Sequence, residues 1–179
     1  MITSMPRLTS DPSYRVDVSL TDLLKYVKDL VEHEHLDIDP DFQRGHVWNQ
    51  EQRVRWVEYL LKSGRPHPNH PILLNHPNWM GSSSKYADFV LVDGKQRLTA
   101  ALDYMNGKFP VFHGHEGNDA GWFISDIPIK YLRSNCLAFS VNTLATRREV
   151  LDWYLELNEG LVSHQPAELA RVKELRNLL

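Results

Sequence analysis

The segment that most constrains the fold is FVLVDGKQRLTAALDYMNG, at residues 89–107. Its first four residues form an apolar run, which predicts a buried β-strand. After an Asp-Gly pair, apolar residues recur at i, i+3, i+4 and i+7, which predicts the buried stripe of a helix that ends near the last glycine. A strand therefore passes into a helix through a tight turn rich in charge and hydrogen-bonding groups. That turn carries Asp93, Gly94, Lys95, Gln96 and Arg97.

The rest of the chain alternates helical patterns with short apolar runs, which predicts a mixed α and β fold. Capping signals stand at the expected helix starts, where an N-cap side chain satisfies free backbone N–H groups. Helices are expected at 20–32, 50–64, 147–157 and 166–179, begun by Ser19, by the Asn49/Gln52 pair and by the Thr146/Glu149 pair. Further short strands are expected at 71–75, 108–112 and 136–141.

Length and composition predict one domain at 15–179 after a loose polar arm at 1–14. The formal net charge of −3 means that any contact with nucleic acid must come from a local basic patch. The single cysteine, Cys136, excludes an internal disulfide framework and a cysteine-rich zinc site, and its apolar neighbours predict a buried thiol. Without a membrane-spanning run or a signal peptide, the sequence predicts a cytoplasmic protein.

The charged turn is suited to an anion. The first N–H groups of a helix lack partners within the helix, the helix dipole adds positive charge there, and glycine permits close approach of a ligand. Phosphate is the usual guest of such a site, and Arg97 could bind two of its oxygens. Asp93 would repel a bare phosphate, but it fits a site that holds Mg²⁺, a water or a ribose. The competing interpretation is that Asp93 only caps the helix and that Arg97 pairs with a surface carboxylate.

A second polar stretch, DPDFQRGHVWNQEQR, precedes the expected helix at 50–64. It places Gln43, Arg44 and Trp48 in a loop ahead of a helix N-terminus. The loop is either another edge of a binding site or a structural connection with Trp48 in the core.

Four ordered motifs carry a family resemblance: FQRGHVW at 42–48, SGRPHP at 63–68, VDGKQRLTAAL at 92–102 and YLELNEGLVSHQPAEL at 154–169. Together they resemble the DGQQR-motif domain of the ParB/sulfiredoxin-like superfamily. That domain is the GmrS-like N-terminal part of GmrSD-type modification-dependent restriction enzymes and of related phage-defence proteins. The resemblance spans about residues 17–175.

The resemblance implies an α+β fold of the ParB/sulfiredoxin-like kind, with a small mixed sheet flanked by helices. It also implies a nucleotide-binding domain that hydrolyses NTPs with Mg²⁺, although no motif identifies the base. Carried over by position, the catalytic candidates are Asp93, which would also hold Mg²⁺, Gln96 and Arg97. The nucleotide-binding candidates are Gln43, Arg44, His67, Gly94, Lys95, Thr99 and Asn158.

The sequence departs from the family pattern in two ways. Lys95 stands where the DGQQR motif of the family has its first glutamine. The lysine would either strengthen a phosphate contact or lose a polar role of that glutamine. No counterpart of the C-terminal HNH nuclease domain is expected in these 179 residues.

Two other functions remain open from the sequence. A DNA-binding or ParB-like nuclease module would use the basic strip of Arg53, Arg55 and Lys62, which is otherwise a solvated helix face. A non-catalytic regulator would act as the partner of a nuclease or of another protein subunit. The nine histidines are not expected to form a transition-metal site, because convergent ligands are not evident.

Overall fold

The computed structural model describes residues 12, 14–43, 45, 47–63, 70–79, 89–159 and 166–179. The helices in this part are α1 (Leu20–Glu32), α2 (Gln50–Ser63), α3 (Lys95–Met105), α4 (Ile129–Ser134), α5 (Arg147–Glu159) and α6 (Pro166–Asn177). The strands are β1 (Tyr14–Ser19), β2 (Ile72–Asn75), β3 (Val90–Asp93) and β4 (Cys136–Asn142). Two single 3-10 turns, η1 (His115–Gly117) and η2 (Ile124–Asp126), lie between α3 and α4. None of the described helices has the length and apolar character needed to cross a bilayer.

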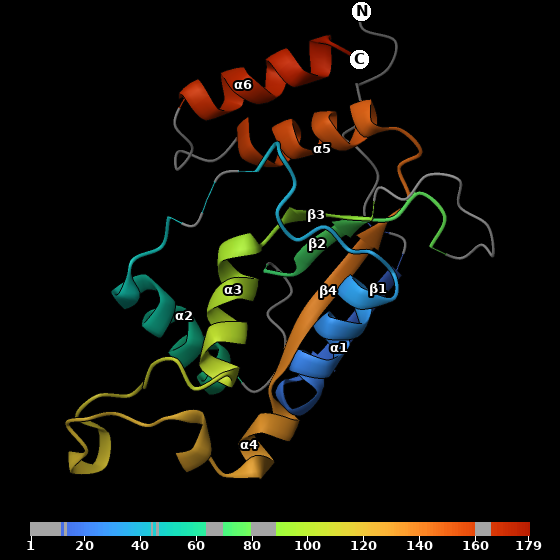
Figure 1. Cartoon of the computed structure of the whole chain (residues 1–179). Helices are drawn as coiled ribbons and strands as arrows, with labels where there is room; N and C mark the ends of the chain where they lie inside the picture. The colour runs from blue at the N-terminus through green and yellow to red at the C-terminus, as the bar shows by residue number, and fades with distance from the viewer. Residues whose placement is uncertain are drawn as a thin grey trace, which may run out of the picture.

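The four strands form one sheet in the order β1-β4-β2-β3 (Figure 1). β1 pairs with β4, and β2 with β3, in antiparallel fashion, whereas β2 and β4 run parallel. The sheet is therefore small and mixed, and six helices accompany it in the described part of the chain. This confirms the predicted α+β fold.

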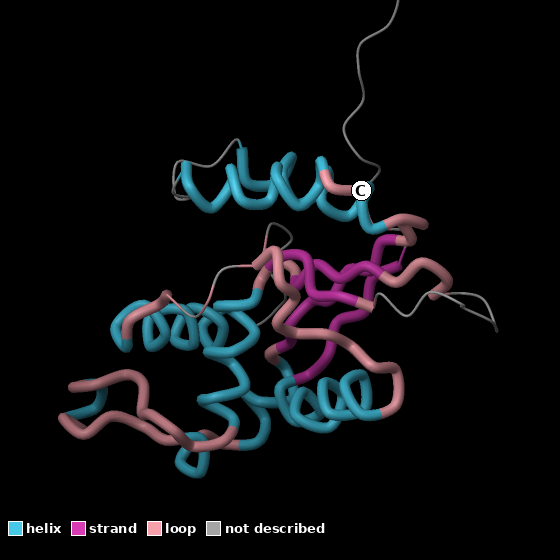
Figure 2. The backbone as a smooth tube through the Cα atoms, turned by 45° about the horizontal axis from the view of Figure 1, so that its top comes forward, coloured by secondary structure: helices cyan, strands magenta, loops and turns pink. Residues whose placement is uncertain are grey.

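The two faces of the sheet are covered by different helices, because successive side chains of a strand point to opposite faces. On β3, Leu91 packs into the core with residues of α1 and α3. Its neighbours Val90 and Val92 pack against residues of α5 and α6. Figures 1 and 2 show α5 and α6 together on one side, with the strands between this pair and the other helices. The end of β3 thus lies between two helical layers.

A third apolar cluster joins α2 to α3. Val57 of α2 packs with Ala100 and Tyr104 of α3, and Phe109 and Val111 extend the cluster past the end of α3. The indole Nε1 of Trp56 also donates to the backbone carbonyl of Arg97 at 3.1 Å. α2 is thereby fixed against the first turn of α3.

Two of the predicted helix caps are confirmed by reciprocal hydrogen bonds. The Asn49 N–H donates to the Gln52 side chain, and the Gln52 N–H donates to the Asn49 side chain, both at 2.9 Å. Thr146 and Glu149 form the same arrangement at 2.9 and 3.3 Å. Ser19 is the N-cap of α1, but its hydroxyl donates to the Asp22 carboxylate rather than accepting a backbone N–H.

Three local predictions differ from the structure. The loose arm is predicted to end at residue 14, but Tyr14 is already the first residue of β1. Residues 1–11 and 13 of the arm lie outside the described part. The strand expected at 108–112 is absent, and only Val111 forms a bridge, with Trp122. Pro110 supplies no N–H for a longer ladder. Cys136 is half-buried rather than fully buried, and burial, with a smaller contribution from Asp17, raises the pKa of its thiol.

Replacing Asn49 with alanine is expected to lower the free energy of unfolding by about 1 kcal/mol, because the first turn of α2 loses its side-chain acceptor. Urea denaturation followed by tryptophan fluorescence measures this difference. Gln50→Ala, at the next and exposed position, is the control and is expected to change stability little. An Asn49→Ala midpoint equal to that of the control would show that the cap does not stabilise α2.

Candidate functional site

A cavity of about 640 Å³ lies where the first turn of α3, the end of β3, the loop before α2 and the last turns of α5 meet. Three stretches singled out in the sequence contribute to its lining. They supply Gln43 from the loop, Asp93 to Arg97 from the turn and Asn158 from α5. The structure therefore brings together polar residues that are far apart in the sequence.

Gly94, the N-cap of α3, has a backbone conformation that favours glycine. Its φ is +99°, in the left-handed region. A Cβ at this position would lie 2.8 Å from Cδ1 and 3.2 Å from Cα of Ile72 on β2. The missing side chain lets β2 pack directly against the turn. Lys95, Gln96 and Arg97, whose N–H groups have no acceptor within the helix, line the cavity.

Arg97 lies at the cavity with part of its hydrogen-bonding capacity unused. Its Nη2 donates to the Asp93 carboxylate at 2.6 Å and to the Pro71 carbonyl at 3.1 Å. Its Nε is buried and has no acceptor in the described part of the chain. Asp93 does not cap the helix, because the N-cap is Gly94; it instead pairs with Arg97 four residues along.

Lys95 is held by a carboxylate from another loop. Its side chain is only 13% exposed, and its Nζ donates to Asp39, whose side chain is 75% exposed. An ion pair with so exposed a carboxylate is screened by solvent and contributes little to stability. Loss of the Asp39 contact alone would therefore cost little.

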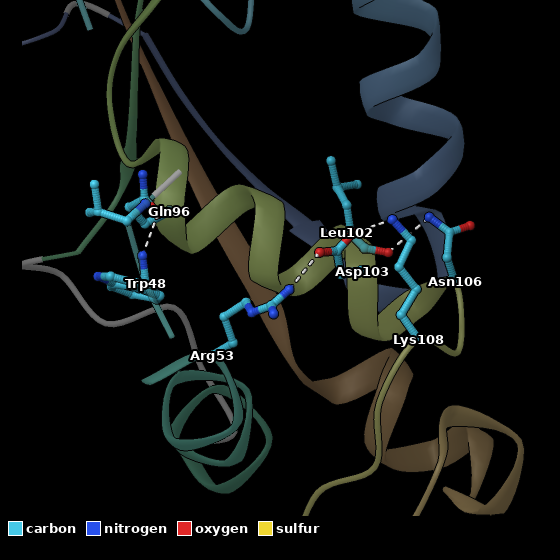
Figure 3. A network of polar contacts seen from close by, with 8 residues as sticks. Trp48, Arg53, Gln96, Leu102, Asp103, Asn106 and Lys108 are labelled. Atoms are coloured by element: carbon cyan, nitrogen blue, oxygen red, sulfur yellow. Dashed lines mark hydrogen bonds and ion pairs between the residues drawn. The ribbon is translucent and has the colours of Figure 1, made fainter. Parts of the chain in front are cut away.

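Gln96 is buried and bonds the loop before α2 (Figure 3). Its Oε1 accepts the N–H groups of Val47 and Trp48 at 3.1 and 3.2 Å. Its Nε2 donates to the Gly45 carbonyl at 3.1 Å. These contacts make Gln96 the residue that holds the loop against α3, and its predicted catalytic role stays a prediction.

The remaining predicted nucleotide-binding residues divide into three groups. Gln43 and Asn158 line the cavity; Gln43 also donates to the Leu91 carbonyl, and Asn158 to the Tyr154 carbonyl at 2.6 Å. Thr99 is half-buried in α3 and does not line the cavity. Arg44 and His67 lie outside the described residues.

The cavity also has an apolar and aromatic wall, of which the sequence indicated only Trp48, as part of a possible binding edge. Trp48, Leu73, Val92, Tyr154 and Leu157 contribute to this wall. Tyr154 precedes Asn158 by four residues and so shares its helix face, a spacing that could have indicated it. Gln52 and His70 line the cavity as well; the proline-rich connector around His70 gave no periodic signal.

The basic strip predicted to bind DNA is balanced by acidic partners. Arg53 lies 3.3 Å from Asp103 (Figure 3), Arg55 lies 2.5 Å from Glu51, and Lys62 lies 3.7 Å from Glu58. Paired in this way, the three cations do not form a patch of unbalanced positive charge. Their role in DNA binding stays a prediction.

The described residues contain no group of three or more His, Cys, Asp or Glu side chains that could hold a metal ion. Mg²⁺ needs less, because it usually keeps several waters and binds one or two carboxylates together with substrate phosphates. Asp93 lines the cavity, and its side chain is 43% exposed. The donor set therefore fits a magnesium ion that arrives with a nucleotide.

Comparison with known proteins matches residues 27–133 to the family model described as "GmrSD restriction endonuclease, N-terminal domain". The chain belongs to this family. The resemblance to a GmrS-like N-terminal domain is thereby confirmed, and the GmrSD family gives the chain a context of restriction and phage defence. The matched range includes Gln43 and the whole 93–97 turn, whereas Asn158 lies beyond it. Neither a curated protein nor a solved structure matches the chain.

Proposed function

We propose that this GmrSD N-terminal domain binds a nucleoside triphosphate with Mg²⁺ in the cavity at the start of α3, and hydrolyses it. Arg97 carries the proposal, because its guanidinium lies at the cavity and keeps a buried Nε without an acceptor in the described part of the chain. Buried polar groups are seldom left unpaired in native proteins. A bound anion would supply acceptors at this position.

The surroundings of Arg97 support phosphate as that anion. The helix N-terminus presents N–H groups that lack acceptors within the helix, and the positive end of a dipole. Lys95 adds a second cation, which is ion-paired with the exposed Asp39 carboxylate. A planar guanidinium can bind two phosphate oxygens at once.

The shape and walls of the cavity support a nucleotide rather than free phosphate. A volume of about 640 Å³ lies within the range of about 300–1,000 Å³ typical of small-molecule sites. The rings of Trp48 and Tyr154, with the side chain of Leu73, offer apolar area to a base. Among the described residues that line the cavity, no group selects one base, so all four NTPs are candidates.

Asp93 is the residue that would hold Mg²⁺, which supplies positive charge to the phosphates when it is bound. Without the metal, the Asp93 carboxylate would oppose an anion and would compete with it for Arg97, to which it is already paired at 2.6 Å. Enzymatic phosphoryl transfer depends mostly on positioning and on stabilising charge. In this chain Arg97 and Lys95 would stabilise the charge, and Asp93 would also orient the attacking water.

The decisive experiment is a thermal-shift titration with ATP, GTP, CTP and UTP, each with and without Mg²⁺. A ligand that binds only the folded state stabilises it by about 2.7 kcal/mol at a hundredfold excess over Kd. We expect at least one NTP to raise the Tm of the wild type in a Mg²⁺-dependent way. Arg97→Ala should remove the shift, and Asp93→Asn should remove its Mg²⁺ dependence.

Arg53→Ala is the matched control, because it also breaks an Arg–Asp pair but lies outside the cavity. This variant should keep the full nucleotide shift. If no NTP changes the Tm at millimolar concentration, nucleotide binding is contradicted. A shift without phosphate release over several hours would contradict hydrolysis and leave binding in place.

A further inference from the structure

A second and larger cleft, of about 810 Å³, lies at the other end of the domain. The C-terminal half of α2 forms one wall, and the segment from Phe112 to Tyr131, which joins α3 to α4, forms the other. Figure 1 shows this segment projecting from the body on the side away from α5 and α6. The cleft shares no lining residue with the nucleotide cavity, so the proposed function does not account for it.

Aromatic side chains line the cleft. Phe112, Trp122 and Tyr131 contribute to it, and Tyr131 is 48% exposed. Beside them in the sequence, Phe123 and Ile129 are also exposed. The indole Nε1 of Trp122 is buried without an acceptor in the described residues. Exposed aromatic surface next to unsatisfied polar atoms is typical of an interaction site.

The charges that line the cleft are predominantly negative. Glu58, Glu116 and Asp126 line it, against the ammonium group of Lys62 and the imidazoles of His113 and His115. Lys62 is already engaged, at 3.7 Å from Glu58 and 5.1 Å from the centre of the Phe112 ring. Within the part of the chain that the structure describes, neither Glu116 nor Asp126 has an ion pair with a lysine or arginine. The cleft therefore offers carboxylates to a cation.

The walls of the cleft are fixed in place before any ligand arrives. Val111 and Trp122 exchange two backbone hydrogen bonds of 3.0 and 2.7 Å, which close the base of the projecting segment. The Phe112 N–H donates to the Glu58 carboxylate at 2.8 Å and ties this segment to α2. A preformed site needs little ordering on binding, which favours affinity.

We propose that this cleft is the docking site of a protein partner that inserts an arginine flanked by apolar residues. An arginine guanidinium stacks on aromatic faces and donates to carboxylates, so it matches both features of the lining. Its apolar neighbours would cover the exposed rings of Phe123 and Tyr131. Nucleic acid is the less suitable occupant, because the carboxylates would repel its phosphates.

An NMR titration with the peptide acetyl-Leu-Arg-Leu-amide tests this proposal directly. The reporter is the indole N–H resonance of Trp122, assigned among the five tryptophans through a Trp122→Phe variant. We expect a saturable shift of this resonance. The same peptide with citrulline in place of arginine, which keeps the shape and removes the charge, should bind at least about fivefold more weakly.

Variants of the protein provide the second arm of the test. The double substitution Glu116→Gln with Asp126→Asn should weaken binding of the arginine peptide by a similar factor. It should leave the Tm of the protein nearly unchanged. Glu51→Gln with Asp119→Asn removes the same number of charges from exposed positions that line neither cavity, and it should have no effect.

Three results would overturn the docking proposal: no saturable shift at millimolar peptide, equal binding of the citrulline peptide, or saturation of the Trp122 resonance by duplex DNA instead. The last result would favour a nucleic-acid surface. All of these measurements are made without nucleotide, so their outcome is independent of the proposed NTP site.

Discussion

Replacing Gln96 with leucine is expected to weaken nucleotide binding about tenfold or more, while the free energy of unfolding falls by about 2 kcal/mol. Leucine keeps much of the volume of the buried side chain but removes both of its polar ends. The N–H groups of Val47 and Trp48 and the carbonyl of Gly45 then lose their partner. The loop can regain hydrogen bonds from water only by moving away from α3.

The loss of affinity follows from what the loop carries. Trp48 and Val47 line the cavity proposed to bind nucleotide, so a displaced loop opens one wall of this cavity. Gln43, another lining residue, comes from the same stretch of chain. A residue that touches only the backbone of this loop can therefore determine how well the cavity holds a ligand.

Amide hydrogen exchange separates this positioning role from a general loss of stability. In Gln96→Leu, the amides of Val47 and Trp48 should lose protection, whereas amides in β4 should keep it after correction for global stability. Gln96→Glu keeps acceptor oxygens for both N–H groups and should give an intermediate result. Gln50→Leu makes the same chemical change at an exposed position and should alter neither protection nor affinity. Unchanged protection at 47 and 48 would contradict the role assigned to Gln96.

The parts of this site that were predictable from the sequence depend on residues only a few positions apart. The strand, turn and helix at 89–107 follow from the change of apolar period. The capping box of α2 follows from the spacing of Asn49 and Gln52. Local rules such as these predict the turn, and the ordered motifs indicate the family that the comparison shows.

The contacts that complete the site join residues that are far apart in the chain. Lys95 pairs with Asp39, 56 residues earlier, and Gln96 bonds a loop about 50 residues earlier. No periodic pattern encodes such pairings, because they depend on how β3 and the loop before α2 pack together. Composition alone likewise could not show that the basic residues of α2 are matched by Asp103, Glu51 and Glu58.

The second cleft was also beyond sequence reasoning, for a physical reason. Phe112 and Glu116 adopt positive φ values of 55° and 53°, although neither is glycine. Such conformations are uncommon for these residue types and are maintained by surrounding contacts. The apolar residues at 108–112 predict a strand, because no residue type there signals a positive φ. In the structure the chain turns at Phe112 instead and forms one wall of the cleft.

The largest loss of stability is expected from Gly94→Ala, at about 4 kcal/mol. Part of this cost, about 1–3 kcal/mol, arises because the new residue would keep a φ of +99°, which L side chains rarely adopt. The other part is steric, since the added Cβ would lie 2.8 Å from Cδ1 and 3.2 Å from Cα of Ile72. Ile72 is fully buried in the centre of the sheet, so relief of this contact requires a shift of β2. Overpacking of this kind typically costs about 1–3 kcal/mol.

Gly117→Ala separates the two parts of that cost. Gly117 also has a positive φ, of 76°, but a Cβ there would meet no atom within 4 Å. Its substitution should therefore cost only about 1 kcal/mol, from backbone strain. Urea denaturation of both variants gives the comparison, and a difference of about 3 kcal/mol would measure the packing of β2 against the turn. Equal losses of stability in the two variants would mean that the turn is not in close contact with β2. In that case Gly94→Ala should retain nucleotide binding. The added Cβ of Gly94→Ala would also lie 3.2 Å from Nη2 of Arg97. Because the close contact with β2 therefore displaces Arg97 as well, Gly94→Ala should lose stability and nucleotide binding together.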